Sequence, residues 1–211
     1  LAGDIEEPTF NDILAARRLI EQHLPRTPLY ESISLGRMLG LTLFIKYENH
    51  QPVGAFKVRG TLNKVLNLTP EERVRGVVTG SMGNHGQGVC YGARLIGVQA
   101  TVVMPEKANP DKVEAMRNLG AEVVFHGEGF EEASERAMEL EREKGYVYFH
   151  AANDPWIVAG HGTIGLVATL AHLGRIGPAG ARKSTDSLPP IMPDSACTAT
   201  TSSPQRSKIL W

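Results

Sequence analysis

The sequence predicts an α/β fold built around parallel strands, on three observations. Short apolar runs with strand character recur between residues 76 and 149. Helical patterns of about 10–15 residues separate these runs. A helix between two successive strands is long enough to cross over the sheet, so the strands are expected to pair in parallel as βαβ units. The third observation is that hydrophobic residues make up 42% and charged residues 21% of the 211 residues, which is typical of a globular chain with a sizeable core.

Before residue 76, apolar periodicity and capping residues predict three helices and one strand. The helices are expected at residues 10–24, at residues 58–66 and from Thr69, and the strand at residues 41–47. Thr9 can act as the N-cap of the first helix, and Pro25 ends it. The segment Thr69-Pro70-Glu71-Glu72 is a capping box with proline at the first helical position.

From Gly76 onward, strands and helices alternate regularly. The strands are expected at residues 76–79, 100–104, 122–125 and 146–149. The helices are expected at residues 85–96, from Asn109-Pro110 to Gly120, from Phe130 to Gly145, and from Asp154-Pro155 toward Ala171. Because parallel sheets bind ligands at the carboxyl ends of their strands, a site is expected in the turn after Thr79.

Charge and cysteine content exclude several classes of protein. The formal net charge is -1, which argues against a general nucleic-acid binder or a protein of anionic membrane surfaces. No apolar run approaches the roughly 18 residues that span a bilayer, and residues 1–8 do not have the pattern of a signal peptide. Two cysteines exclude a disulfide scaffold and fit a reducing compartment, so a cytoplasmic location is expected.

The last part of the chain differs in composition from the rest. Residues 174–211 contain five of the 13 prolines and ten serine or threonine residues, and they carry five basic against two acidic side chains. Such a segment buries too little apolar surface to offset the entropy lost on ordering it. We therefore expect a tail of low order at residues 174–211.

A glycine-rich turn follows the first strand of the alternating region. It reads Gly80-Ser81-Met82-Gly83-Asn84-His85-Gly86-Gln87-Gly88, with a hydroxyl, an amide and an imidazole among four glycines. A helix is expected to begin there, so its free backbone N–H groups would favour an anion such as a carboxylate or a phosphate. The alternative is a flexible strand-to-helix turn with incidental polar residues.

Lys57 lies in a second distinctive segment, Pro52-Val53-Gly54-Ala55-Phe56-Lys57-Val58-Arg59-Gly60. It stands between Phe56 and Val58, just after a Pro/Gly turn and at the expected start of a helix. An amine held among apolar neighbours can serve as a nucleophile or as a base. The alternative is an ordinary surface lysine on an amphipathic helix.

Other candidate motifs predict no separate site. The segment Gly160-His161-Gly162-Thr163-Ile164-Gly165 matches the glycine pattern of dinucleotide-binding proteins, but it lies inside an expected helix. The acidic residue at the required distance, Asp186, lies in the tail. The seven histidines show no zinc-ligand spacing, so no metal site is expected, and Cys90 is expected to be a small packing residue.

Together, the segments around Lys57 and over residues 80–88 resemble the serine/threonine dehydratases, which are tryptophan-synthase-β-like (fold type II) enzymes that use pyridoxal 5′-phosphate. The resemblance covers about residues 10–170 and includes Arg26-Thr27-Pro28-Leu29, Val103-Met104-Pro105, Lys112-Val113-Glu114-Ala115 and residues 159–165. It implies a three-layer αβα fold with parallel sheets. It also implies dehydration and deamination of L-threonine or L-serine to a 2-oxo acid and ammonia.

The resemblance assigns roles to residues of both segments. Lys57 is implied to form an aldimine with the cofactor and then to take the Cα proton of the substrate. Phe56 is implied to pack near the pyridine ring, and Asn84 to hydrogen-bond the 3-oxygen of the cofactor. The substrate carboxylate is implied to bind at Ser81, Met82, Gly83, Asn84 and His85. Family members are often dimers or tetramers, so a homo-oligomer is implied as well.

Two departures from the family pattern leave alternatives open. Met82 stands where serine racemases of this family carry a second serine, and a thioether cannot move a proton, so dehydration is favoured over racemisation. The family pattern continues with a run of four glycines that binds the cofactor phosphate, whereas Gly174, Gly177 and Gly180, interrupted by Pro178, follow in this chain. A truncated, inactive family member, a serine racemase and a β-replacement enzyme therefore stay alternatives.

The resemblance also implies domain boundaries. Residues 1–75 would form the N-terminal part of a large domain that carries the cofactor lysine, and residues 76–151 would form a small βαβ domain. Residues 152–173 would return to the large domain. The C-terminal part of that domain would be missing, or replaced by the tail at residues 174–211.

Overall fold

The computed structural model describes residues 7–172 and 207–210 of the chain. Contacts within the chain divide it into two compact units. Unit 1 comprises Leu1–Thr27 and Glu48–Ile164, and unit 2 comprises Pro28–Tyr47 and Gly165–Trp211. Unit 1 contains every residue for which the sequence predicts a site role. The domain boundaries that the resemblance implies stay a prediction.

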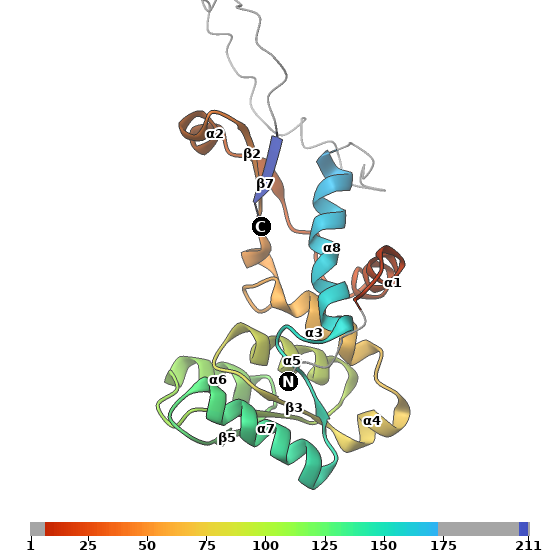
Figure 1. Ribbon diagram of the computed structural model, residues 1–211, viewed down its shortest axis with the longest axis vertical. Helices are drawn as coiled ribbons and strands as arrows, with labels where there is room; N and C mark the ends of the chain where they lie inside the picture. Colours follow the sequence, from red (N-terminus) through yellow and green to blue (C-terminus); the bar gives the residue numbers. More distant parts are fainter. Residues whose placement is uncertain (1–6, 173–206, 211) are drawn as a thin grey trace, which may run out of the picture. The chain divides into compact units, whose positions relative to one another are not determined.

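Unit 1 is built on a four-stranded sheet with the strand order β5-β4-β3-β6 (Figure 1). Its strands are β3 (Val77–Gly80), β4 (Ala100–Met104), β5 (Glu122–Phe125) and β6 (Val147–Tyr148). Every pairing in this sheet is parallel, and Val77 of β3 lies opposite Ala100 on one side and Val147 on the other. The parallel βαβ units expected from the sequence are therefore confirmed.

Helices cover both faces of this sheet, which gives the three layers expected of the fold. Two helices pack on one face and a third packs on the other (Figure 1). They are α5 (Asn84–Ile96) and α6 (Pro110–Asn118) on the first face, and α7 (Phe130–Lys144) on the second. A sheet covered in this way must be apolar on both faces, which is why its strands read as continuous hydrophobic runs.

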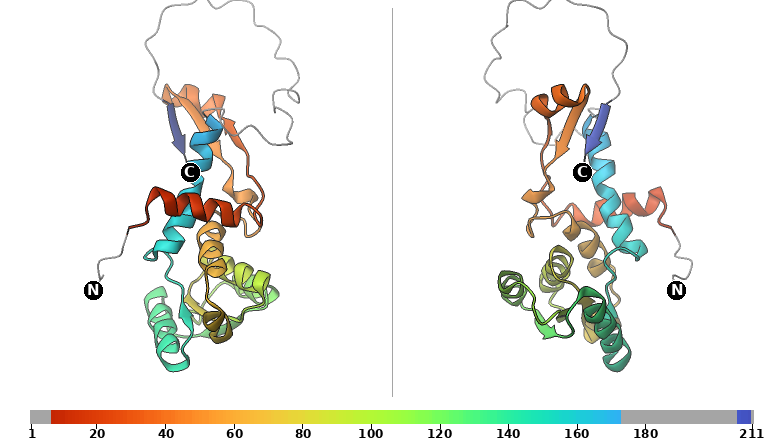
Figure 2. Two further views of the ribbon diagram at one scale, coloured as in Figure 1. Left: turned by 90° about the vertical axis from the view of Figure 1, so that its right-hand side faces the viewer. Right: turned by 60° about the vertical axis from the view of Figure 1, so that its left-hand side comes forward.

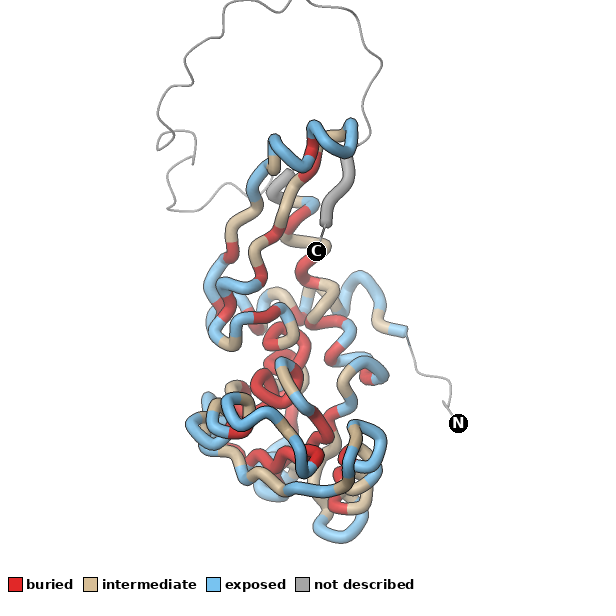
Figure 3. Tube along the Cα trace, turned by 90° about the vertical axis from the view of Figure 1, so that its left-hand side faces the viewer, coloured by how far each residue is buried: buried red, intermediate tan, exposed pale blue. Residues whose placement is uncertain are grey.

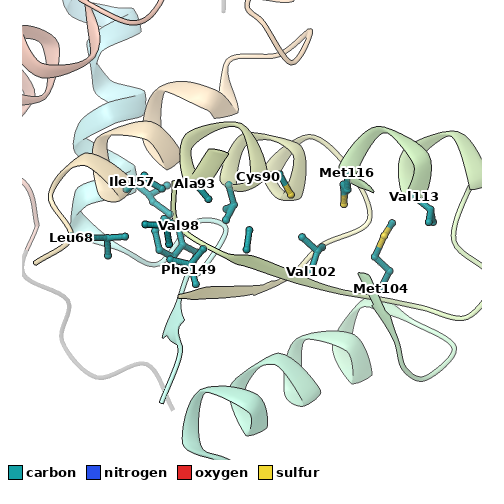
Figure 4. Packing of buried hydrophobic residues seen from close by; sticks show 14 residues of the cluster. Leu68, Cys90, Ala93, Val98, Val102, Met104, Val113, Met116, Phe149 and Ile157 are labelled. Atoms are coloured by element: carbon teal, nitrogen blue, oxygen red, sulfur yellow. The ribbon is translucent and has the colours of Figure 1, made fainter. Parts of the chain in front are cut away.

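Alternating strand residues divide between the two cores of unit 1. On β4, Val102 and Met104 belong to the core beneath α5 and α6, whereas Val103 belongs to the core against α7. Figure 4 shows Val102 and Met104 on the side of the sheet where Cys90 of α5 and Met116 of α6 also lie. Cys90 is 1% exposed and belongs to this core, which confirms that it is a packing residue.

Unit 1 also contains a second group of helices, of which α3 packs against α5. The group consists of α1 (Phe10–Ile20), α3 (Lys57–Leu66), α4 (Pro70–Arg75), a 3-10 turn η1 (Glu48–His50) and residues 155–164 of α8 (Pro155–His172). Most residues of α3 and α5 are buried (Figure 3). A Cβ atom on Gly88 of α5 would lie 2.6 Å from Thr61 Oγ1 and 3.3 Å from Val58 Cα, both of α3. Glycine at this position therefore lets the two helices approach closely, and this brings the start of α3 near the start of α5.

The signals for helix starts and the glycine stop of α7 are confirmed, whereas α1 ends at Ile20, before the stop expected at Pro25. Thr9 and Asp12 form a capping box at the start of α1, and Thr69 and Glu72 form one at the start of α4. Gly145 ends α7 with a φ of +73°, a left-handed conformation that glycine adopts without strain. These residues fix where the helices begin and end, so the connecting turns are fixed as well.

The glycine pattern of residues 160–165 lies within α8, as the sequence predicts, and serves helix packing. A Cβ atom on Gly160 would lie 2.6 Å from Gly60 Cα, and a Cβ atom on Gly162 would lie 2.9 Å from Ile13 Cδ1. These glycines let α8 approach α3 and α1 closely. Within the residues that the structure describes, no helix combines the length and the apolar character needed to cross a membrane.

Unit 2 contains a second sheet with the strand order β1-β2-β7 (Figure 2). Its elements are β1 (Leu29–Glu31), α2 (Ile33–Leu39), β2 (Thr42–Lys46) and β7 (Ser207–Leu210). The strand β1 runs antiparallel to β2, and β7 runs parallel to it, with Thr42 opposite Ser207. Figure 2 shows β7 in blue alongside β2 in orange.

The strand β7 corrects part of the expectation of low order at residues 174–211. Ser207–Leu210 pairs with β2, where no ordered element is expected from composition. An unpaired strand edge offers a row of N–H and C=O groups, and a short segment from far along the chain can complete it. Composition is averaged over the whole tail and does not register such a segment. The other tail residues, including Gly174, Gly177 and Gly180, lie outside the described residues.

Candidate active site

The turn between β3 and α5 forms one side of the candidate site. Ser81 is buried, and its Oγ atom accepts hydrogen bonds from the backbone N–H of Gly83 at 3.3 Å and of Gly86 at 2.9 Å. These two bonds fold the turn around the hydroxyl. The backbone N–H groups of Asn84 and His85, at the start of α5, have no acceptor among the described residues. The start of this helix can therefore bind an anion.

The glycines of this turn are required by close packing at one end and leave open space at the other. A Cβ atom on Gly80 would lie 2.6 Å from the Cα of Ser134 on α7, so a larger residue does not fit there. Nothing lies within 4 Å of the position of a Cβ atom on Gly83. A ligand can therefore approach the backbone at Gly83.

His85 fixes the turn to the chain that follows β6. Its Nε2 atom lies 3.2 Å from the carbonyl oxygen of Phe149, and because a carbonyl only accepts, Nε2 carries the proton. Its Nδ1 atom is buried without a hydrogen-bond partner. Burial lowers the pKa of His85 to about 4, and the charge of Lys57 lowers it further, against the hydrogen bond to Phe149, which raises it. The neutral ring has no free N–H, so His85 can bind a carboxylate only through its backbone.

Lys57 and Phe56 form the other side of the candidate site. Lys57 is the first residue of α3, is partly buried, and places its Nζ atom 5.9 Å from the centre of the Phe56 ring. The Phe56 side chain is 39% exposed. An aromatic ring that stays accessible beside an amine can contact a flat ligand that the amine holds.

His161 of α8 also reaches this side of the site, and the sequence assigns it no role. Its ring lies edge-on to Phe56 with the ring centres 5.0 Å apart, and its Nε2 atom lies 3.4 Å from the carbonyl oxygen of Lys57. It is 104 residues from Lys57 along the chain and lies in a glycine pattern that points to a different kind of site. No local sequence signal could have found this contact.

A buried ion pair lies close by on α3. Arg59 binds Glu48 through two hydrogen bonds, from Nε to Oε2 at 2.6 Å and from Nη2 to Oε1 at 2.9 Å. Thr27 also donates to Glu48 at 2.5 Å, and Arg59 Nη1 lies 3.4 Å from the hydroxyl of Thr163 on α8. The pair therefore connects the segment before Lys57, the helix that Lys57 begins, and α8. The sequence shows Arg59 near Lys57 but gives no sign that Glu48 is its partner.

A second ion pair, which is partly buried, holds the start of α8. Lys64 of α3 donates to Asp154 at 2.5 Å and to the carbonyl oxygen of Tyr148 at 2.5 Å, and it lies 4.4 Å from the centre of the Phe149 ring. Asp154 also accepts hydrogen bonds from the backbone N–H of Trp156 and Ile157, so it caps α8. Lys64 therefore ties α3 to the chain between β6 and α8.

The structure brings some of the predicted residues together and leaves others apart. Lys57 is near enough to His85 for its charge to affect the imidazole, and Phe56 lies beside it. Met82 is exposed on the turn, and Asn84 is exposed at the start of α5. No hydrogen bond among the described residues joins the Asn84 side chain to either side of the site. Within residues 7–172 and 207–210, no group of three or more His, Cys, Asp or Glu side chains could hold a metal ion.

Comparison with known proteins places this arrangement in a family. The family model described as "Pyridoxal-phosphate dependent enzyme" matches residues 20–175. The L-threonine ammonia-lyase of Thermotoga maritima is 45% identical over 158 residues, which is 75% of this chain and 39% of that protein. The chain thus spans well under half the length of this curated relative.

Solved structures show the same similarity in three dimensions. The threonine deaminase isoform 2 of Solanum lycopersicum, in its processed form, is 34% identical with a TM-score of 0.72, and the match covers 82% of this chain and 50% of that one. Maize serine racemase is 33% identical with a TM-score of 0.75, and the match covers 81% of this chain and 52% of that one. The parallel sheet with helices on both faces agrees with these matches. The chain belongs to the family of pyridoxal-phosphate-dependent enzymes of fold type II.

Proposed function

We propose that this chain is part of a pyridoxal-phosphate-dependent lyase that converts L-threonine or L-serine to a 2-oxo acid and ammonia. One observation supports this proposal above the others. The amine of Lys57, beside the accessible ring of Phe56, belongs to the same compact unit as the start of α5, where two backbone N–H groups lack acceptors among the described residues. An amine suits the aldehyde of the cofactor, and free amides at a helix start suit the carboxylate of an amino acid.

The residues present fit the aldehyde and ring of the cofactor. Lys57 Nζ would hold the aldehyde carbon, and the exposed face of Phe56 would contact the pyridine ring. Asn84, at the start of α5, is the residue we propose for the hydrogen bond to the ring 3-oxygen. Gly174, Gly177 and Gly180 follow where the family pattern has its run of four glycines, and they lie outside the described residues, so no phosphate contact is assigned.

Each side chain then has a defined task. When bound, pyridoxal phosphate supplies an electron sink for the charge that develops at the substrate Cα. The Nζ atom of Lys57 would take the proton from that carbon. The backbone N–H groups of Asn84 and His85 hold the substrate carboxylate, with Ser81, Met82 and Gly83 forming the rest of the turn, and so fix the orientation of the substrate. The β-hydroxyl would leave with a proton as water, and hydrolysis of the remaining enamine would release the 2-oxo acid and ammonia.

Racemisation and β-replacement are the competing reactions, and Met82 argues against racemisation. Met82 is 50% exposed on the turn, and its thioether cannot donate or accept a proton usefully. A racemase needs a second acid or base on the face of Cα opposite Lys57, and Met82 does not supply it. This favours dehydration, although a serine racemase is among the structures that match.

The proposal includes a homo-oligomer and a cytoplasmic location. The location rests on the low cysteine content, with Cys90 present as a free, buried thiol. The oligomer rests on the family resemblance alone. Size-exclusion chromatography with light scattering would measure the oligomeric state of the chain directly.

The reaction is tested by adding pyridoxal phosphate and L-threonine or L-serine to the purified chain, with no other nucleophile. We expect release of ammonia and the matching 2-oxo acid, and loss of both products in Lys57→Ala. The matched control is Lys107→Ala, which removes an exposed lysine and should keep full activity. Turnover that occurs only after a thiol is added would indicate β-replacement. Formation of D-serine from L-serine would indicate a racemase. The absence of any product would mean that the chain alone is inactive.

A further inference from the structure

We propose that His161 is a positioning residue for Lys57 and Phe56, and that it acts by fixing the first turn of α3. This inference deepens the proposed function and rests on it, because it takes Lys57 as the reactive amine. His161 holds the backbone carbonyl of Lys57 with its Nε2–H and holds the Phe56 ring with the edge of its own ring. It would touch neither the reacting atoms nor the cofactor aldehyde.

The hydrogen bond sets the direction of the imidazole. Nε2 of His161 lies 3.4 Å from the carbonyl oxygen of Lys57, and only a protonated Nε2 can bond to a carbonyl. The same carbonyl accepts a hydrogen bond from Thr61 Oγ1 at 3.2 Å. Two side chains from two helices therefore converge on the backbone of the residue whose amine reacts.

The glycine beneath His161 shows that the fold makes room for this ring. A Cβ atom on Gly60 would lie 2.5 Å from His161 Nε2 and 2.5 Å from the carbonyl oxygen of Ile157, closer than real Cβ contacts occur. The ring of Phe56 then meets His161 edge-on at 5.0 Å, a favourable arrangement for two aromatic rings. The ring is thus held between α3 and the residue that precedes it.

The charge of His161 also suits this role. Burial lowers its pKa to about 4, and the charges of Lys57 and Arg59 lower it further, against the hydrogen bond to the Lys57 carbonyl, which raises it. The ring is therefore neutral at neutral pH. A neutral donor can hold the backbone of Lys57 without adding a positive charge beside its amine.

Three variants separate the donor from the ring. His161→Gln keeps a neutral N–H donor and loses the ring, His161→Phe keeps a ring and loses the donor, and His161→Ala loses both. The matched control is Val158→Ala, which removes an exposed side chain from the same helix. The free energy of unfolding is measured for each variant, so that a loss of stability can be told from a loss of positioning.

The first readout is capture of pyridoxal phosphate, measured as the borohydride-stable pyridoxyl group on Lys57 against the concentration of cofactor. We expect half-maximal labelling of His161→Phe to need about 3- to 10-fold more cofactor, the range that one hydrogen bond supports. For His161→Gln and Val158→Ala, the cofactor concentration at half-maximal labelling should stay within about threefold of that for the parent chain. For His161→Ala, this concentration should rise at least as much as for His161→Phe.

The second readout needs no cofactor, so it keeps the inference separate from the proposed function. Acetylation of Lys57 is compared with acetylation of the exposed Lys107 in the same sample, over a range of alkaline pH, by peptide mass spectrometry. We expect the pH profile of the Lys57:Lys107 ratio to change in His161→Phe and to be restored in His161→Gln.

An unchanged profile in His161→Phe, or a change that follows unfolding stability in all variants, would overturn the inference. If the parent chain captures no cofactor on Lys57, the proposed function fails for this chain, and the acetylation profile alone decides the role of His161.

Discussion

Arg59 and Glu48 form a buried ion pair, and Arg59 lies two residues along α3 from Lys57. Arg59 is 5% exposed and Glu48 is 8% exposed, and the two hydrogen bonds between them satisfy most of the charged atoms. Removing one partner of such a pair leaves a buried charge with no counter-charge, which costs more than the pair contributes when intact. The pair therefore stabilises the start of α3 only as a unit.

Glu48→Gln is expected to destabilise the chain by about 3–5 kcal/mol, because the Arg59 guanidinium then stays buried without a counter-charge. Urea denaturation followed by circular dichroism measures the change in the free energy of unfolding. The matched control is Glu21→Gln, which breaks the half-exposed pair with Arg17 on α1 and should cost less than about 1 kcal/mol. Equal effects of the two substitutions would show that the buried pair has no special role.

The sequence predicts site residues only where they lie close together along the chain. Lys57, Phe56 and residues 80–88 are visible because each group falls within one short motif. His161 reaches Lys57 from 104 residues away, and Glu48 reaches Arg59 from a separate 3-10 turn. The folded arrangement of three segments decides these contacts, so no spacing rule could reveal them.

Among the elements, α3 is the one most constrained by its neighbours. It packs against α5 through the close approach at Gly88, and against α8 through Gly60 and Gly160. Each contact places a glycine of one helix against backbone or a confined side chain of another. A methyl group added to this interface must push whole helices apart.

Gly60→Ala is expected to cost about 1–3 kcal/mol of stability, because its Cβ atom would overlap His161 and the backbone of Ile157. Gly92→Ala on α5 is the matched control. Its Cβ atom would meet only the side chain of Val65 at 3.1 Å or more, and alanine favours the helix by about 1 kcal/mol. Thermal unfolding of both variants checks the comparison, and equal melting temperatures would argue against close packing at Gly60.

Most elements follow from the sequence because their signals are local. The capping boxes at Thr9 and Thr69 and the buried valine runs of β3 and β4 lie where they are expected. The sequence does not predict β1, which is three residues long and shows no clear alternation. It also misses α2, although Gly40 closes that helix with a φ of +64°. The strand β7 depends on a partner far away in the chain, so local patterns could not predict it.

On the scale of the whole molecule, the buried His85 and the partly buried His161 make stability depend on pH. Burial lowers the pKa of both His85 and His161 to about 4, from the ordinary value of 6.5 that applies in the unfolded chain. Between these values the unfolded state binds more protons than the folded state. The two neutral rings therefore contribute fully to the free energy of unfolding above about pH 6.5, and this contribution is lost as the pH falls toward 4.

We expect the free energy of unfolding to fall as the pH drops from about 7 to about 5, with His85 alone contributing up to about 3 kcal/mol over its full range. Urea denaturation at several pH values measures this slope. His161→Gln should reduce the slope, whereas His126→Gln, which alters an exposed histidine, should leave it unchanged. A slope that is the same in all three proteins would contradict the assignment to His161.

The central claim is that Lys57 is the amine through which this chain holds pyridoxal phosphate, and one measurement tests it most directly. The chain is titrated with pyridoxal phosphate, reduced with borohydride, and mapped by peptide mass spectrometry. The account predicts a pyridoxyl group on Lys57 at cofactor concentrations that leave exposed lysines such as Lys107 unlabelled. Labelling scattered over surface lysines, or no labelling at Lys57, would contradict it.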